Sequence, residues 1–178
     1  DPPQYVYETN RKVFGDDYPW YPAIGNHESE TKKDMVWLRE YLSKPLPGMV
    51  RKGPENCTET TYSFDHKDVH FVVLNQYYNG KSDTGTNGDV VDELYEWLKN
   101  DLEQNTKEMV FVIGHEPIVP LPDADNGRHR HKGDNLDNHP ENSHRFQQLL
   151  GKHKVAAYFC GHTHNFSYAN LNGIVQID

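Results

Sequence analysis

The sequence of 178 residues lacks a long apolar run and an excess of positive charge. Its apolar stretches fall well short of the roughly 18 residues that a membrane-spanning helix requires, so we predict no membrane span. Eighteen Lys and Arg stand against 27 Asp and Glu, which gives a net charge of −9 with neutral histidines. Because no basic stripe runs along the chain, binding of nucleic acid through its phosphate backbone is not expected.

The sequence opens at Asp1 and not at methionine, and we predict no signal peptide within it. We therefore expect a processed form or an excised piece of a longer chain. The length suits one domain over residues 1–178, and neither a repeat nor a linker divides it. Cysteine is scarce: Cys57 lies in a polar stretch and Cys160 ends an apolar run. Both are predicted to be free thiols, with a disulfide as the alternative.

Hydrophobic periodicity predicts helices that alternate with strands, as in α/β proteins. The expected helices cover residues 4–14, 34–43, 89–103 and 140–152, the expected single strands 20–24, 109–113 and 155–160, and the expected hairpins 60–75 and 168–177. Between two of these elements, residues 116–139 form a long loop rich in Pro, Asp, Asn and His. A structureless loop of this length in a compact domain is usually functional or disordered.

Histidine, by contrast, is abundant, with 11 residues. Three segments repeat one pattern, an apolar run followed by glycine and then histidine: Gly25-Asn26-His27, Gly114-His115 and Gly161-His162-Thr163-His164. Glycine lets the backbone turn sharply, and ligand sites in α/β sheets form where strands end. A single histidine at a strand end is usually structural, but three such ends favour a metal site, because imidazole suits zinc, iron and similar ions.

In this order, the three motifs resemble the later motifs of calcineurin-like metallophosphoesterases. That family includes purple acid phosphatases, acid sphingomyelinases, cyclic-nucleotide phosphodiesterases and protein phosphatases, whose members often work outside the cytoplasm. The resemblance covers nearly the whole chain. It implies an α/β fold, a four-layer α/β/β/α sandwich of two mixed sheets, here without its first strand and with metal ions at the strand ends.

The resemblance also implies a role for each residue of the motifs. Asn26, His115 and His162 resemble ligands of the second metal, and His164 resembles a ligand of the first. His27 resembles the outer-sphere histidine that contacts phosphate and protonates the leaving group. The implied cofactors are two divalent or trivalent metal ions, Fe, Zn or Mn.

Two departures from the family pattern concern the first metal. The Asp-x-His motif of the opening strand is absent, so we expect this chain to hold one metal ion instead of two. The second departure concerns the family's Gly-Asp motif, which normally supplies the carboxylate that bridges both metals. For this role Asp1 is the favoured candidate. Asp16 is the other, although it lies too close to Asn26 for the intervening helix. We interpret Glu28 as a carboxylate that fixes the loop around the site.

The long loop carries His129 and His131 among three basic residues. Two interpretations stay open: these histidines bind substrate phosphate or donate a proton, or the loop is simply solvated. The other histidines have no motif around them and are predicted to be structural or at the surface: His66, His70, His139, His144 and His153.

The resemblance thus predicts a metal-dependent hydrolase of phosphate esters with a dinuclear metal centre and a metal-bound hydroxide as nucleophile. The metal cations would also reverse the repulsion between an acidic protein and an anionic substrate. A small-molecule or lipid phosphate ester is expected, with a phosphomonoester favoured. One alternative is a phosphodiesterase of the sphingomyelinase or cyclic-nucleotide type, because residues 21–29 look like acid sphingomyelinases. An alternative of another class is a non-catalytic scaffold with this fold, or an inactive fragment.

Overall fold

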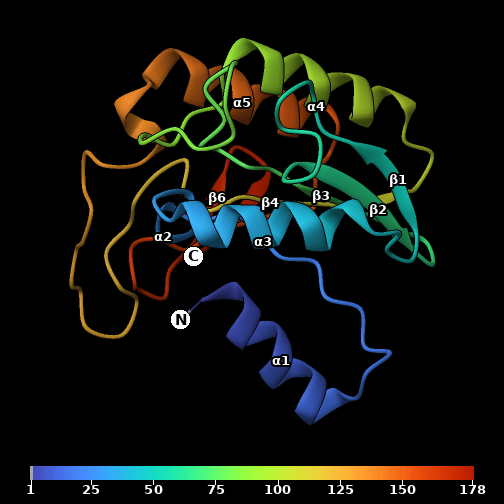
Figure 1. Ribbon diagram of the computed structural model, residues 1–178. Helices are drawn as coiled ribbons and strands as arrows, with labels where there is room; N and C mark the ends of the chain where they lie inside the picture. The colour runs from blue at the N-terminus through green and yellow to red at the C-terminus, as the bar shows by residue number, and fades with distance from the viewer. Residues whose placement is uncertain (1) are drawn as a thin grey trace.

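A computed structural model describes residues 2–178, whose strands form one seven-stranded mixed sheet (Figure 1). The strand order is β1-β2-β3-β4-β5-β7-β6. The strands are β1 (Met49–Lys52), β2 (Tyr62–His66), β3 (Val69–Val73), β4 (Met109–Ile113), β5 (Ala157–Phe159), β6 (Tyr168–Leu171) and β7 (Ile174–Ile177). The four strands β3, β4, β5 and β7 are parallel, and antiparallel strands flank them on both sides.

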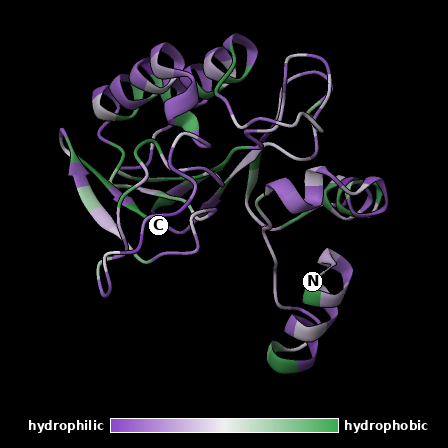
Figure 2. Ribbon diagram, turned by 90° about the vertical axis from the view of Figure 1, so that its left-hand side faces the viewer, coloured by the Kyte–Doolittle hydropathy of each residue, from purple (hydrophilic) through white to green (hydrophobic). Residues whose placement is uncertain are grey.

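Helices α4 (Asp92–Gln104) and α5 (Pro140–Lys152) cover one face of the sheet (Figure 1). The main core lies between them and the strands, with Leu98 and Phe146 packed in the same cluster as Val112. Apolar residues gather on the strands and the adjoining sides of these helices (Figure 2). None of the helices within residues 2–178 has the length and apolar character needed to cross a membrane.

Helix α3 (Lys32–Ser43) packs beside β2, where its Tyr41 belongs to one cluster with Tyr62. Helix α1 (Pro3–Phe14) lies outside α3, to which Tyr7 connects it through aromatic contacts. Two short helices complete the described chain, α2 (Asn26–Ser29) and the 3₁₀ helix η1 (Leu136–Asn138).

Strand register determines where the functional segments lie. Val73 pairs with Ile113, and Ile113 pairs with Phe159, so the carboxyl ends of β3, β4 and β5 form one edge. The loops that leave these strands therefore start side by side, which is where ligands bind in open α/β sheets.

The predicted α/β fold with a mixed sheet is confirmed, but one local prediction is wrong. Trp20 to Ile24 forms no strand, because Pro19 and Pro22 cannot donate to a ladder. Hydroxyl groups bind the carbonyls there instead: Tyr41 donates to Trp20 at 2.9 Å, and Tyr62 does the same to Pro22 at 2.9 Å.

The closing hairpin extends the mixed sheet at one side. Among residues 2–178 the closing hairpin does not begin a second sheet, because β7 pairs in parallel with β5 and β6 then pairs with β7. The described strands therefore form one sheet. The edge strand β1, which the sequence did not predict, extends the opposite side by pairing with β2.

Candidate metal centre

Two of the Gly-His motifs directly follow parallel strands. Gly114-His115 leaves β4, and Gly161-His162 leaves β5 after Cys160. The backbones stay joined beyond the strands, since Gly161 donates its N–H to the carbonyl of His115 at 2.9 Å. The imidazole rings of His115 and His162 consequently lie with their centroids 5.1 Å apart.

Asn26 reaches the same place from a different segment. It begins α2, and its Oδ1 lies 3.1 Å from Nε2 of His115. Glu28 fixes this turn, because its carboxylate accepts the backbone N–H of Gly25 at 3.0 Å. The three segments therefore bring an amide oxygen and two imidazoles together.

The glycines of the motifs serve different purposes. A Cβ on Gly25 would lie 2.8 Å from Cε1 of His115, and one on Gly114 would lie 2.5 Å from the hydroxyl of Tyr158. Side chains at these two positions would displace the groups that form the site. At Gly161, by contrast, a Cβ would meet nothing within 4 Å.

Backbone conformation singles out the histidines after β5. His162 has φ 71° and His164 has φ 55°, both in the left-handed region that non-glycine residues seldom occupy. Such conformations persist where the surrounding structure enforces them, and they cluster at functional sites. The His162 side chain is 7% exposed, whereas His164 is at the surface.

The protonation of the two inner histidines favours metal binding. Burial, together with repulsion from the other imidazoles, lowers the pKa of His115 to about 4. Burial and the neighbouring His131 likewise lower the pKa of His162. Neutral imidazoles have a free lone pair, which is the state that binds a metal ion.

The two candidate histidines of the long loop, His129 and His131, lie in different surroundings in the structure. The ring of His131 lies 4.5 Å from that of His162 and 5.9 Å from that of His164, measured between centroids. His129 turns away, and its Nε2 lies 3.1 Å from the carbonyl of Pro120. Of this pair, only His131 joins the cluster.

His27 lies beside the cluster in α2. Its side chain is 78% exposed, and its Nδ1 lies 3.9 Å from the carboxylate of Glu30. This position suits a group that meets a substrate from the solvent side. Of the two carboxylate candidates, Asp1 lies outside the described residues, whereas Asp16 is a surface residue whose carboxylate accepts Nε of Arg11 at 2.9 Å.

The model of the calcineurin-like phosphoesterase family matches residues 1–166. The chain belongs to this family. The tartrate-resistant acid phosphatases type 5 of Oryctolagus cuniculus and Rattus norvegicus are each 27% identical over 183 residues, which cover 94% of this chain and 51% of each relative. The chain thus spans about half the length of these curated relatives.

Two solved structures align with the chain, and the first of them has a related fold. GAP50, the anchor in the inner membrane complex of Plasmodium, aligns with a TM-score of 0.53 and 14% identity over 89% of this chain and 48% of that chain. Purple acid phosphatase PPD1 from Lupinus luteus seeds aligns with a TM-score of 0.45 and 18% identity, over 69% and 23% respectively. The resemblance to the calcineurin-like family that the motifs indicated is confirmed.

In this calcineurin-like phosphoesterase, two buried glutamines support the site and were not predicted. Oε1 of Gln76 accepts the backbone N–H groups of His115 and Glu116, both at 2.7 Å. Gln176 does the same further along the loop, accepting those of Ile118 at 2.9 Å and Val119 at 3.2 Å. The only feature of the sequence that could have pointed to Gln76 is its position shortly after strand β3.

Glu116 is a second unpredicted group beside the cluster. It is 4% exposed and accepts the hydroxyl of Tyr77 at 2.8 Å. Burial raises the pKa of Glu116 to about 7. Its carboxyl group also fills the space that a side chain at Gly88 would need.

His70 occupies a separate, structural site at the opposite edge of the sheet. Its Nδ1 lies 2.7 Å from Asp65, and its Nε2 lies 2.8 Å from Asp101. A cavity of about 290 Å³ adjoins it. His70 is at the amino end of β3, whereas the metal centre is at the carboxyl ends. The predictions that His70 is structural and that both cysteines are free thiols are confirmed.

Proposed function

We propose that this chain carries part of the metal-binding site of a phosphatase, which hydrolyses phosphate esters at a dinuclear metal centre. The observation that carries the proposal is the meeting of Asn26 Oδ1 and His115 Nε2 at 3.1 Å, with the His162 ring 5.1 Å from that of His115. Three segments far apart in the sequence supply these groups. Amide oxygen and neutral imidazole are ordinary donors to zinc, manganese and iron.

The residues take distinct roles in this proposal. Asn26, His115 and His162 hold one ion, and His164 faces a neighbouring ion. When bound, two such ions supply a nucleophile at neutral pH and neutralise the phosphate oxygens. His27 protonates the departing oxygen from the solvent side. Asp1, the proposed bridging carboxylate, lies outside the described residues.

A preference for monoesters follows from the charge beside the site. Arg128 donates to the carbonyl of His164 at 2.9 Å, and Arg130 contacts its Nδ1 at 3.1 Å. Two guanidinium groups held at the rim favour a phosphate dianion over the single charge of a diester. The acid phosphatases among the relatives support the same substrate class.

The test compares the purified full-length protein, loaded with Zn²⁺ or Mn²⁺, on an aryl phosphate monoester and on the matching diester. We expect faster turnover of the monoester, and we expect His115→Ala to abolish both metal binding and turnover. His144→Ala, which alters an exposed residue of α5, should change neither. Faster turnover of the diester would indicate a phosphodiesterase. If neither ester were hydrolysed, with or without added metal, the result would indicate a scaffold.

Metal content provides a second test on the 178-residue chain. Catalytic sites usually use at least three protein ligands for a divalent ion. One proposed ion has three ligands here, while the described residues give the other only His164. We therefore expect about one tightly bound ion per chain by mass spectrometry. Two tightly bound ions per chain would contradict this assignment.

A further inference from the structure

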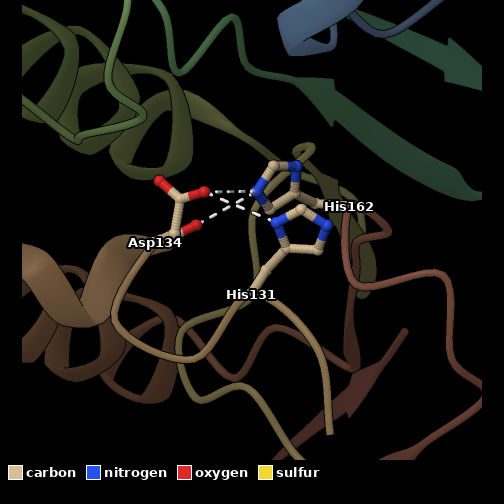
Figure 3. A group of neighbouring side chains, drawn as sticks. All are labelled: His131, Asp134 and His162. Carbon is tan, nitrogen blue, oxygen red and sulfur yellow. Dashed lines mark hydrogen bonds and ion pairs between the residues drawn. The ribbon is translucent and has the colours of Figure 1, made fainter.

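The loop between β4 and η1 places a carboxylate inside the histidine cluster. His131, Asp134 and His162 each offer one ligand atom, these atoms all lie within 4.8 Å of one another, and the three side chains turn toward a common point (Figure 3). Oδ2 of Asp134 lies 3.4 Å from Nδ1 of His131 and 3.9 Å from Nε2 of His162. Ligands about 2.0–2.2 Å from one metal ion are themselves roughly 3–4 Å apart.

Contacts on both sides hold this loop against the motifs. Before the carboxylate, Arg128 and Arg130 bind His164. After it, Asn135 is 1% exposed, and its amide donates to the carbonyl of His131. Leu136 then enters the main core. The position of Asp134 is therefore fixed by neighbours that do not depend on its own side chain.

The backbone of the loop supplies an independent indication. His131 has φ 53°, so it shares the left-handed conformation of His162 and His164 in the motif beside it. For residues other than glycine this conformation is uncommon, and it is often associated with functional sites. The loop residue His131 and the motif residue His162 share this conformation although they are 31 positions apart in the sequence.

Charge gives a chemical reason for a further ligand. Asn26, His115 and His162 are all neutral donors, so a divalent ion held by them alone keeps its full charge. Asp134 is the carboxylate nearest to Nε2 of His162 among the contacts of the described chain. A carboxylate ligand both neutralises part of the charge and suits zinc or manganese.

We propose that Asp134, with His131 beside it, binds the same metal ion as His162, so that the loop between β4 and η1 provides an anionic ligand. This inference rests on the proposed function, because it requires a metal ion at His115 and His162. Nε2 of His162 lies 3.0 Å from the carbonyl of Asp134. Coordination through Nε2 would replace that contact, and the ring would then carry its proton on Nδ1.

Metal affinity tests the proposal without any assay of turnover. The apo protein is titrated with Zn²⁺ by calorimetry and with Co²⁺, whose absorption bands report the ligands of the ion. Asp134→Asn should weaken binding about 10- to 100-fold, the range found when groups around a metal are removed, and should shift the Co²⁺ bands. His131→Ala should also weaken binding and shift the bands.

Two further variants separate the possible outcomes. Asp125→Asn removes one negative charge from an exposed position of the same loop, so it should leave affinity and bands unchanged. An equal loss in both Asp variants would overturn the proposal, because general electrostatics would then explain it. If His115→Ala weakens binding but Asp134→Asn does not, this inference is wrong and the proposed function stands. If neither variant weakens binding, both are wrong.

Discussion

Gly25 leaves the space that the imidazole of His115 occupies, since a Cβ on Gly25 would lie 2.8 Å from Cε1 and 2.9 Å from Nδ1 of that ring. Gly25 has φ −104°, which other residues adopt readily. The requirement for glycine is therefore steric, and it comes from packing between two segments of the site.

Gly25→Ala should consequently displace His115 and weaken metal binding. Forcing an extra methyl group into packed surroundings costs about 1–3 kcal/mol of stability. Gly161→Ala is the matched control, because a Cβ there meets nothing within 4 Å. Urea unfolding and Zn²⁺ titration of both variants provide the measurement. Equal behaviour of the two alanine variants would contradict the steric explanation.

A second prediction concerns the two buried glutamines. Gln76→Ala leaves the N–H groups of His115 and Glu116 without their acceptor, and each unsatisfied buried group costs about 1–3 kcal/mol. Gln176→Ala removes an equivalent acceptor from Ile118 and Val119. Both variants should lose stability in urea.

Metal affinity distinguishes the two glutamines. Only Gln76 holds the backbone of a proposed ligand, so Gln76→Ala should lower Zn²⁺ affinity as well as stability. Gln176→Ala should lower stability alone. Equal losses of affinity in calorimetry would show that Gln76 acts on the whole sheet and not on His115.

The elements that sequence predicted well are those whose signal is local. The spacing of Leu94, Leu98 and Leu102 indicated α4, and an unbroken apolar run indicated β4. The strand predicted at residues 20–24 failed because Pro22 within it and Pro19 before it cannot donate to a ladder. The four-residue strand β1 was missed because its pairing with β2, not its own composition, defines it.

The residues of the candidate site fall into the same two groups, those with a local sequence signal and those that only the fold brings into place. Asn26, His115 and His162 stand in short motifs, so their type and spacing were visible in the chain. Gln76 and Asp134 were not, because each acts through a contact that only the fold creates. Loop composition drew attention to His131 and also to His129, and only the structure separates the two.

A third prediction uses the ring of His70 between Asp101 and Asp65. Burial alone would lower the pKa of His70, but the hydrogen bonds to the two carboxylates outweigh it and raise the pKa. Arg51 contacts Asp101 at 3.2 Å, and Lys107 contacts Asp65 at 3.7 Å. The folded state thus binds the proton more tightly than the unfolded state does.

The sign of the pH dependence follows from this raised pKa. The stabilising contribution of His70 is complete below the unfolded pKa of about 6.5 and is lost as pH rises through the folded pKa. The difference in unfolding free energy between the wild type and His70→Gln should therefore shrink as pH rises. His153 is an opposite control, because burial lowers its pKa, so its contribution should be lost as pH falls. A His70 difference that is constant with pH would contradict the prediction.

The last prediction concerns His27, whose exposed side chain lies beside Asn26. If His27 protonates the leaving group, its loss matters most when the departing oxygen is strongly basic. His27→Ala should lower kcat about 10²- to 10⁴-fold on an alkyl phosphate, the usual contribution of a general acid. An aryl phosphate releases a weakly basic oxide, so its kcat should fall far less. His66→Ala, which alters an exposed residue at the end of β2, should leave the ratio of the two rates unchanged. Equal losses on both esters would assign His27 to phosphate binding instead, because binding a common phosphate group does not depend on the leaving group.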